Sequence, residues 1–186
     1  MTLLRKANKI LLLVFLLLVI SGYTNNGYKS IEEAIQHGGI KYKQIYHQHE
    51  VNNGIIVFYE NPNGGIDAGI VYKLGDKYKW GFGGGTVPFP TEEAVTWGWV
   101  NLDSNAKDAE KQYQLYYGVI KETQISTLHI KHKGSEEYID KDAEIIKLFD
   151  GNRLWFALQD KYIEKYYDGF ILTGFNKDGT RVYHFD

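Results

Sequence analysis

Alternation of apolar and polar residues recurs through residues 45–82 and restricts the fold of this chain more than any other feature. In the segment 66–74, one side of an extended chain is entirely apolar: Ile66, Ala68, Ile70, Tyr72 and Leu74. Asp67 and Lys73 fall on the opposite side. Because successive side chains of a strand point to opposite faces, the pattern predicts a sheet with one buried and one wet face.

Sequences typical of tight turns separate these alternating segments. Residues 52–54 read Asn-Asn-Gly, residues 61–65 read Asn-Pro-Asn-Gly-Gly, and Gly75-Asp76 ends the segment described above. We therefore expect an antiparallel meander of four or five strands. Its last strand is expected to contain Val95, Trp97 and Trp99.

One short helix is expected before the strands. Ser30 is a good N-cap and Glu33 stands three residues later, which is the pattern of a capping box. Ala34 and Ile35 share one helix face, and Gly38-Gly39 suits the helix exit. A helix of about two turns is unstable by itself, so we expect it to lie on the sheet.

The second half of the chain reads as strands only. Residues 103–114 are rich in Asp, Asn and Lys without a hydrophobic period, which predicts a linker. Six short apolar segments follow in residues 115–186 and predict an immunoglobulin-like β-sandwich of two sheets. The expected fold class is thus α+β to mainly β, with a helix and antiparallel meander in residues 23–102 before the sandwich.

The first 22 residues have the layout of a secretory signal peptide. Arg5, Lys6 and Lys9 precede eleven consecutive apolar residues, 10–20, and Ser21-Gly22 follow. A retained N-terminal anchor is the alternative interpretation. In a bacterial lipoprotein a cysteine would follow this sequence, but the chain has Tyr23, whose phenol is a poor nucleophile for lipidation.

Composition excludes several classes of protein. There is no cysteine, so disulfides, thiolate catalysis and thiolate metal sites are ruled out. Without the leader, 18 basic and 23 acidic residues give a net charge of −5, which argues against nucleic acid as a partner. We expect contact with a membrane only through the N-terminal segment.

Several segments together resemble a group of small extracytoplasmic proteins of Firmicute type, many of them lipoproteins. The matching sequences are YKSIEEAI, GIIVFYE, GIVYKLGDKYKWGFGGG, YYGVIKETQI, RLWFALQD and GFNKDG. The resemblance spans nearly the whole chain and implies export to the cell surface or medium. Tyr23 departs from the lipidated cysteine that is usual in this group.

Two histidines form a weak candidate metal site. His47 and His49 fall on the same side of an expected strand, where two imidazoles can share a metal ion. Further ligands would have to come from the set His129, His132, Glu50 and Asp67. The alternative is that both histidines simply lie at a sheet margin. No cofactor is expected.

Trp97 and Trp99 form the candidate ligand-binding site. They fall on one face of an expected strand, and paired indoles provide a stacking surface for sugar rings. Val95 shares that face, and large aromatic residues more often belong to a core, so burial is the competing interpretation.

No motif for nucleophilic catalysis is present in the sequence. None of its serines lies in a Gly-x-Ser-x-Gly elbow, and the glycines of residues 81–85 lack the Lys-Ser/Thr ending of a phosphate-binding loop. We therefore favour a non-enzymatic exported protein that binds a cell-surface partner. The alternatives are a protein that binds cell-wall carbohydrate through the two tryptophans, or a hydrolase using carboxylates from the set Glu60, Asp67, Glu92 and Glu93.

Overall fold

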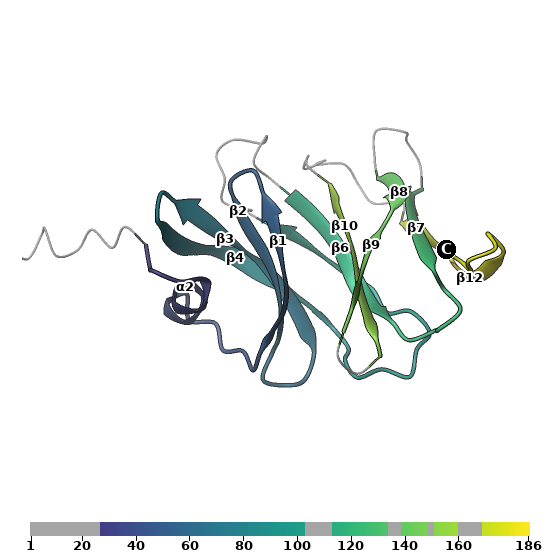
Figure 1. The fold of residues 1–186 in the computed structure, drawn as a ribbon, viewed down its shortest axis with the longest axis horizontal. Coiled ribbons are helices and arrows are strands. Elements are labelled where there is room, and N and C mark those ends of the chain that lie inside the picture. The colour runs from purple at the N-terminus through teal and green to yellow at the C-terminus, as the bar shows by residue number, and fades with distance from the viewer. Residues whose placement is uncertain (1–26, 103–112, 134–138, 149–150, 160–168) are drawn as a thin grey trace, which may run out of the picture.

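The computed structural model describes residues 27–102, 113–133, 139–148, 151–159 and 169–186. Within these ranges the chain forms one short helix and twelve strands, arranged in three antiparallel four-stranded sheets (Figure 1). The mainly β fold with a short helix is therefore confirmed. The expected leader 1–22, Tyr23 and residues 103–112 of the expected linker lie outside the described residues.

Sheet A is the expected meander. Its strands pair in sequence order: β1 (Ile45–Val51), β2 (Gly54–Glu60), β3 (Ile66–Leu74) and β4 (Lys77–Val87). The turns fall at residues 52–53, 61–65 and 75–76, as the turn sequences predicted. Local turn chemistry therefore predicted the strand order of this sheet. The expected wet face was wrong for the central strands, because Val57, Tyr59 and Val71 on that side are buried in a core cluster with residues of α2.

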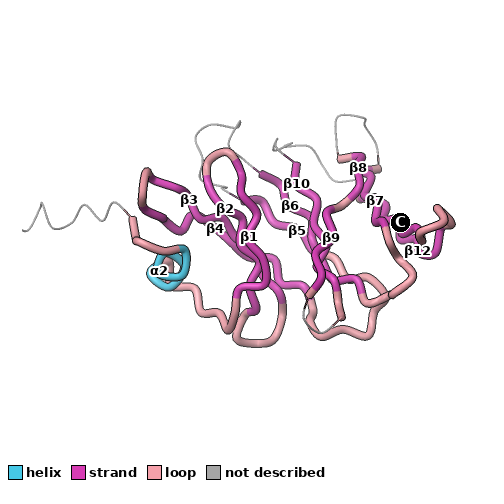
Figure 2. The backbone as a smooth tube through the Cα atoms, viewed as in Figure 1, coloured by secondary structure: helices cyan, strands magenta, loops and turns pink. Residues whose placement is uncertain are grey.

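Helix α2 (Ile31–His37) covers the outer face of sheet A (Figure 2). The hydroxyl of Ser30 accepts a hydrogen bond from the backbone N–H of Glu33 at 3.1 Å, as expected for the N-cap. Ala34 and Ile35 are fully buried against the sheet. Trp80 of β4 packs over Gly69, where a Cβ atom would overlap the indole ring.

Sheet B contains the strand that was expected to complete sheet A. Its order is β5-β6-β10-β9, formed by β5 (Gly98–Leu102), β6 (Tyr113–Ile120), β10 (Arg153–Gln159) and β9 (Glu144–Lys147). The prediction of a fifth meander strand was wrong, because β5 pairs with β6 from Gly98↔Tyr117 to Leu102↔Tyr113. The proposed division at residue 102 thus separates two hydrogen-bonded strands of one sheet.

Sheet C completes the molecule at the end opposite to α2 (Figure 1). Its order is β12-β11-β7-β8, formed by β12 (Arg181–Phe185), β11 (Phe170–Phe175), β7 (Thr127–His132) and β8 (Asp140–Asp142). Strand β8 was not predicted, since a strand of three charged residues has no apolar period. The other strands of the second half lie within the predicted apolar segments, except that β6 begins at Tyr113, so the last two residues of the expected linker 103–114 belong to a buried strand.

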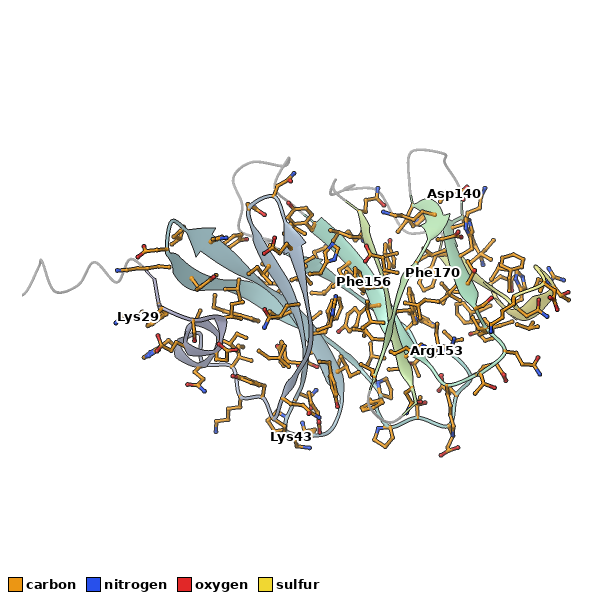
Figure 3. The ribbon with its side chains drawn as sticks, in the orientation of Figure 1. Lys29, Lys43, Asp140, Arg153, Phe156 and Phe170 are labelled. Carbon is orange, nitrogen blue, oxygen red and sulfur yellow. The ribbon has the colours of Figure 1, made fainter. Side chains whose placement is uncertain are left out.

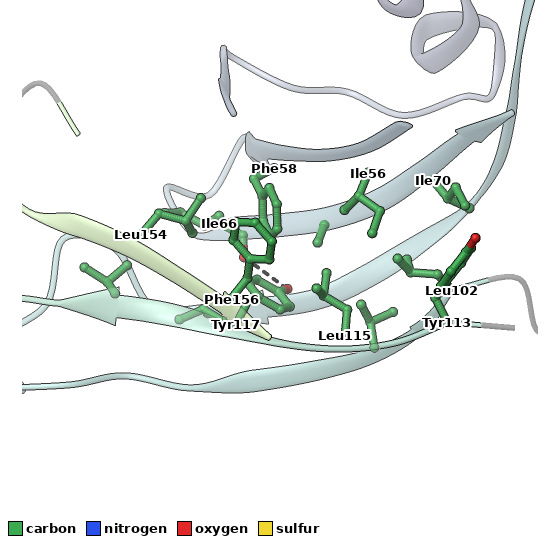
Figure 4. Packing of buried hydrophobic residues seen from close by; sticks show 14 of the residues in the cluster. Ile56, Phe58, Ile66, Ile70, Leu102, Tyr113, Leu115, Tyr117, Leu154 and Phe156 are labelled. Carbon is green, nitrogen blue, oxygen red and sulfur yellow. Dashed lines mark hydrogen bonds between the residues drawn. The ribbon is translucent and has the colours of Figure 1, made fainter. Parts of the chain in front are cut away.

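Sheet B lies between the other two sheets, so its central strands β6 and β10 are buried on both faces. All eight residues of β6 are buried. Tyr117 and Phe156 face sheet A and pack against Phe58 (Figure 4). Tyr116 and Trp155 face sheet C and pack in a separate core with Phe170.

Within the described residues, no helix is long and apolar enough to cross a bilayer.

Candidate functional site

The two candidate tryptophans lie at the open edge between sheets B and C. Trp99 belongs to β5, the edge strand of sheet B, and Trp97 immediately precedes it. Trp99 is paired with Tyr116, whose ring belongs to the core facing sheet C. Trp97 contacts Phe170 and Phe185 of sheet C. Both indoles therefore lie on the same side of sheet B.

The indoles are neither fully buried nor free of support. Trp97 is 38% exposed and Trp99 is 44% exposed, whereas Val95 is buried at 3%. Among the described residues, four large hydrophobic side chains are exposed: Leu74, Phe82, Trp97 and Trp99. Two of the four thus lie within three consecutive residues, which is the kind of exposed apolar patch that marks binding surfaces.

Aromatic packing supports Trp97 from beneath. The ring centroids of Trp97 and Phe170 are 4.8 Å apart, with the two planes at 90°. Phe185 lies 5.4 Å away and also packs on Phe170. Edge-to-face contacts of this kind favour one ring orientation, so the indole is held in place before any ligand arrives.

Thr96 fixes the backbone that leads into β5. Its N–H donates to the carbonyl of Val119 at 2.9 Å, and its hydroxyl accepts from the N–H of Val119 at 3.0 Å. Its carbonyl accepts from the indole N–H of the fully buried Trp155 at 2.9 Å. Gly118 allows this approach, because a Cβ atom there would overlap the Thr96 carbonyl.

Sequence reasoning missed the supporting residues of this site. Phe170 and Phe185 come about 70 residues or more after Trp97 and lie in a different sheet. Figure 3 labels Phe170 among the side chains between the sheets. Their only sequence signal is that each is an apolar residue at a strand end.

His47 and His49 are brought together, as expected for one side of β1. Both rings face sheet B and contact Phe156, at centroid distances of 5.9 Å for His47 and 4.9 Å for His49. Burial lowers the pKa of His47, and the nearby His49 lowers it further. One carboxylate, Glu144, approaches His49, with 3.8 Å between Oε2 and Nδ1.

None of the other proposed metal ligands joins this pair. Glu50 follows His49 along β1 and therefore points to the opposite face of sheet A. Asp67 is hydrogen-bonded to Asn61 and Thr86 on sheet A. His129 and His132 point to opposite faces of β7, as predicted. Across the described ranges, no group of three or more His, Asp or Glu side chains is placed to hold a metal ion. The structure thus contains a pair of histidines on sheet A that pack against Phe156 of sheet B.

Three of the four carboxylates considered for a hydrolase, Glu60, Asp67 and Glu92, form hydrogen bonds or ion pairs with other side chains. Lys43, Gln44 and Tyr46 hydrogen-bond to Glu60 and lower its pKa to about 2. Glu92 forms an ion pair with Lys121 at 2.5 Å. A carboxyl group with so low a pKa is ionised throughout the physiological range, so Glu60 is unsuited to be a general acid.

A separate cavity of about 380 Å³ lies at the hairpin ends of sheet A. Of the candidate site residues, Glu50 alone lines it, and neither His47 and His49 nor the two tryptophans do. Its lining residues are Glu50, Val51, Asn52, Asn53, Gly54, Ile55, Lys73 and Gly75. One basic and one acidic residue at two hairpin ends give no defined preference for a ligand.

Comparisons with family models, with curated proteins and with solved structures found no match to this chain. The fold and the site geometry are therefore the basis for a functional proposal.

Proposed function

We propose that this protein is a non-enzymatic, exported binding module that holds a cell-wall glycan against Trp97 and Trp99. The observation that carries the proposal is the half-exposure of two indoles, 38% and 44%, on one side of an edge strand. A sugar ring has an apolar C–H face that stacks on an indole. Two indoles in sequence positions 97 and 99 suit a chain of at least two sugar rings, because strand side chains two residues apart are separated by about 7 Å.

Preorganisation supports a binding role over a purely structural one. Trp97 rests on Phe170 and Phe185, and its backbone is fixed through Thr96. A rigid surface loses little conformational entropy when a ligand binds. An indole needed only for the core would gain more stability by complete burial, since buried apolar area contributes about 25 cal/mol per Å².

Export is the second part of the proposal. It is supported by the basic and apolar leader pattern in residues 1–22. The resemblance to extracytoplasmic Firmicute proteins gives the same location. Within this proposal, sheets B and C form the immunoglobulin-like sandwich that displays the two indoles, and Tyr23 leaves the protein without a lipid anchor.

A fluorescence titration tests the binding proposal. Protein purified from cells that express the full sequence is titrated with the β-1,4-linked tetramer of N-acetylglucosamine. We expect the tryptophan emission to change and Trp99→Ala to weaken binding at least tenfold, which corresponds to about 1.4 kcal/mol. Phe82→Ala removes an aromatic residue of similar exposure, 39%, from sheet A and serves as the matched control.

Equal affinities of Trp99→Ala and the wild type would refute the site. If the wild type binds no wall oligosaccharide but a surface protein protects Trp99 from solvent, the function is protein recognition instead.

A further inference from the structure

Three amide side chains form a row across sheet B next to the two tryptophans. Asn101 of β5 is paired with Gln114 of β6, which is paired with Gln159 of β10. Alternation places all three on the side that faces sheet C, because Tyr116 and Ala157 of the adjacent row belong to that core. The row lies two residues along the strands from Trp99, or about 7 Å.

Gln114 is the exception among the buried polar residues. The buried polar side chains of the described ranges are Asn61, Thr96, Gln114 and His132. Asn61, Thr96 and His132 have hydrogen-bond partners. Gln114 is only 3% exposed, and its Nε2 has no partner among the described residues. A buried donor without an acceptor lowers stability, so the residue is poorly explained by folding alone.

A complementary acceptor lies on the neighbouring strand. The Oδ1 of Asn101 is also sheltered from solvent and has no hydrogen-bond partner within the described part of the chain. The rest of Asn101 is partly exposed at the edge of sheet B. The amide row is therefore deepest at Gln114 and reaches the surface on the same edge strand that carries Trp99.

We infer that Asn101 and Gln114 form a hydroxyl-binding subsite, which rests on the proposed function of the adjacent indoles. A ligand hydroxyl accepts a hydrogen bond from Gln114 Nε2 and donates one to Asn101 Oδ1. A carboxylate has no proton for Asn101, and an ammonium group has no lone pair for Gln114. The subsite thus selects uncharged sugars.

The variant Gln114→Met tests the inference with two readouts. Methionine has a similar length and needs no hydrogen bond, so we expect the melting temperature to rise by about 2–4 °C. We expect affinity for the N-acetylglucosamine tetramer to fall at least tenfold. Gln48→Met on the exposed side of β1 is the control, and both of its values should stay at those of the wild type.

Asn101→Ala provides an independent variant at a more exposed position. It should weaken binding of the tetramer by a similar factor, and polygalacturonate, an acidic glycan, should bind the wild type at least tenfold more weakly.

A Gln114→Met protein that binds normally, or that melts at a lower temperature, would overturn the subsite. If Trp99→Ala loses binding while Gln114→Met keeps it, the subsite fails and the proposed function stands. If the wild type does not bind the tetramer, both fail.

Discussion

The indole of Trp97 stands perpendicular to the ring of Phe170, with 4.8 Å between the ring centroids. Trp97 leads into sheet B, whereas Phe170 begins β11 of sheet C. This contact therefore joins the candidate binding surface to the core between the two sheets. A change in that core is expected to alter binding as well as stability.

Replacement of Phe170 should show this link. Phe170→Ala removes a side chain that is 6% exposed and contacts three other aromatic rings. We expect a loss of about 3–5 kcal/mol in the free energy of unfolding. Urea unfolding measures that loss. Glycan titration at low temperature, where the variant is still folded, should show weaker binding because Trp97 has lost its support. Unchanged affinity in the folded variant would show that this support is unnecessary.

Gly118 should tolerate no side chain. An alanine Cβ at this position would overlap the Thr96 carbonyl and approach the Trp155 indole nitrogen. Gly118→Ala should therefore break the Trp155–Thr96 hydrogen bond and lower stability by about 1–3 kcal/mol. Near-ultraviolet circular dichroism reports the change at Trp155. Gly84→Ala, where a Cβ meets no atom within 4 Å, is the control. Equal stability of the two variants would contradict the packing at Gly118.

His129 should make stability depend on pH. Its Nδ1 lies 2.9 Å from Asp142, and its Nε2 lies 2.8 Å from Asp140, which also pairs with Lys131. Burial lowers the pKa of His129, but the hydrogen bonds to Asp142 and Asp140 outweigh this effect and raise it. The stabilisation is thus complete below the unfolded pKa of about 6.5 and is lost as pH rises through the folded pKa.

The variant His129→Ala isolates this effect. The wild type should lose up to about 1 kcal/mol of stability as pH rises above about 6.5, because the side chains are partly exposed. Urea unfolding across pH 5.5 to about 8.5 should show no such loss in the variant. A wild type that gains stability over this range relative to His129→Ala would contradict the predicted direction.

The leader should be removed during export. Cleavage after Gly22 would leave Tyr23 as the first residue, without a lipid. Mass spectrometry of the culture medium and of the membrane fraction measures this directly. An intact chain in the cytosol would contradict export, whereas an intact chain in the membrane would favour the retained anchor.

The parts of the fold that local sequence specifies were predictable. The Ser30 cap and the strand at 66–74 depend on neighbouring residues, and both were confirmed. The wet face expected for that strand was wrong, because Val71 on that side is fully buried in the core beneath α2, while Leu74 on the expected buried side is 45% exposed. The partner of β5 was not predictable in the same way. A period of two says which side chains share a face, but it does not say that Gly98 will pair with Tyr117 instead of a strand of the meander.

The candidate site likewise combines residues that local sequence indicated with residues that only the pairing and packing of the sheets bring together. Trp97 and Trp99 were identified from their spacing, because every second residue of a strand lies on the same side. Phe170 and Gln114 contribute through sheet pairing and through contacts between sheets. Gln114 in particular fell at the end of the expected polar linker 103–114, and only the register of β6 places its amide beside Asn101. The metal hypothesis lacked further ligands for the same reason, since His129 and His132, the other histidines proposed as ligands, lie on sheet C.

The indole N–H signals of the four tryptophans provide the most direct test of the binding surface. In a ¹⁵N-labelled protein titrated with the N-acetylglucosamine tetramer, we predict that the signals of Trp97 and Trp99 shift. The signals of Trp80, packed under α2, and of the buried Trp155 should stay in place. A titration in which neither Trp97 nor Trp99 shifts would contradict the glycan-binding account.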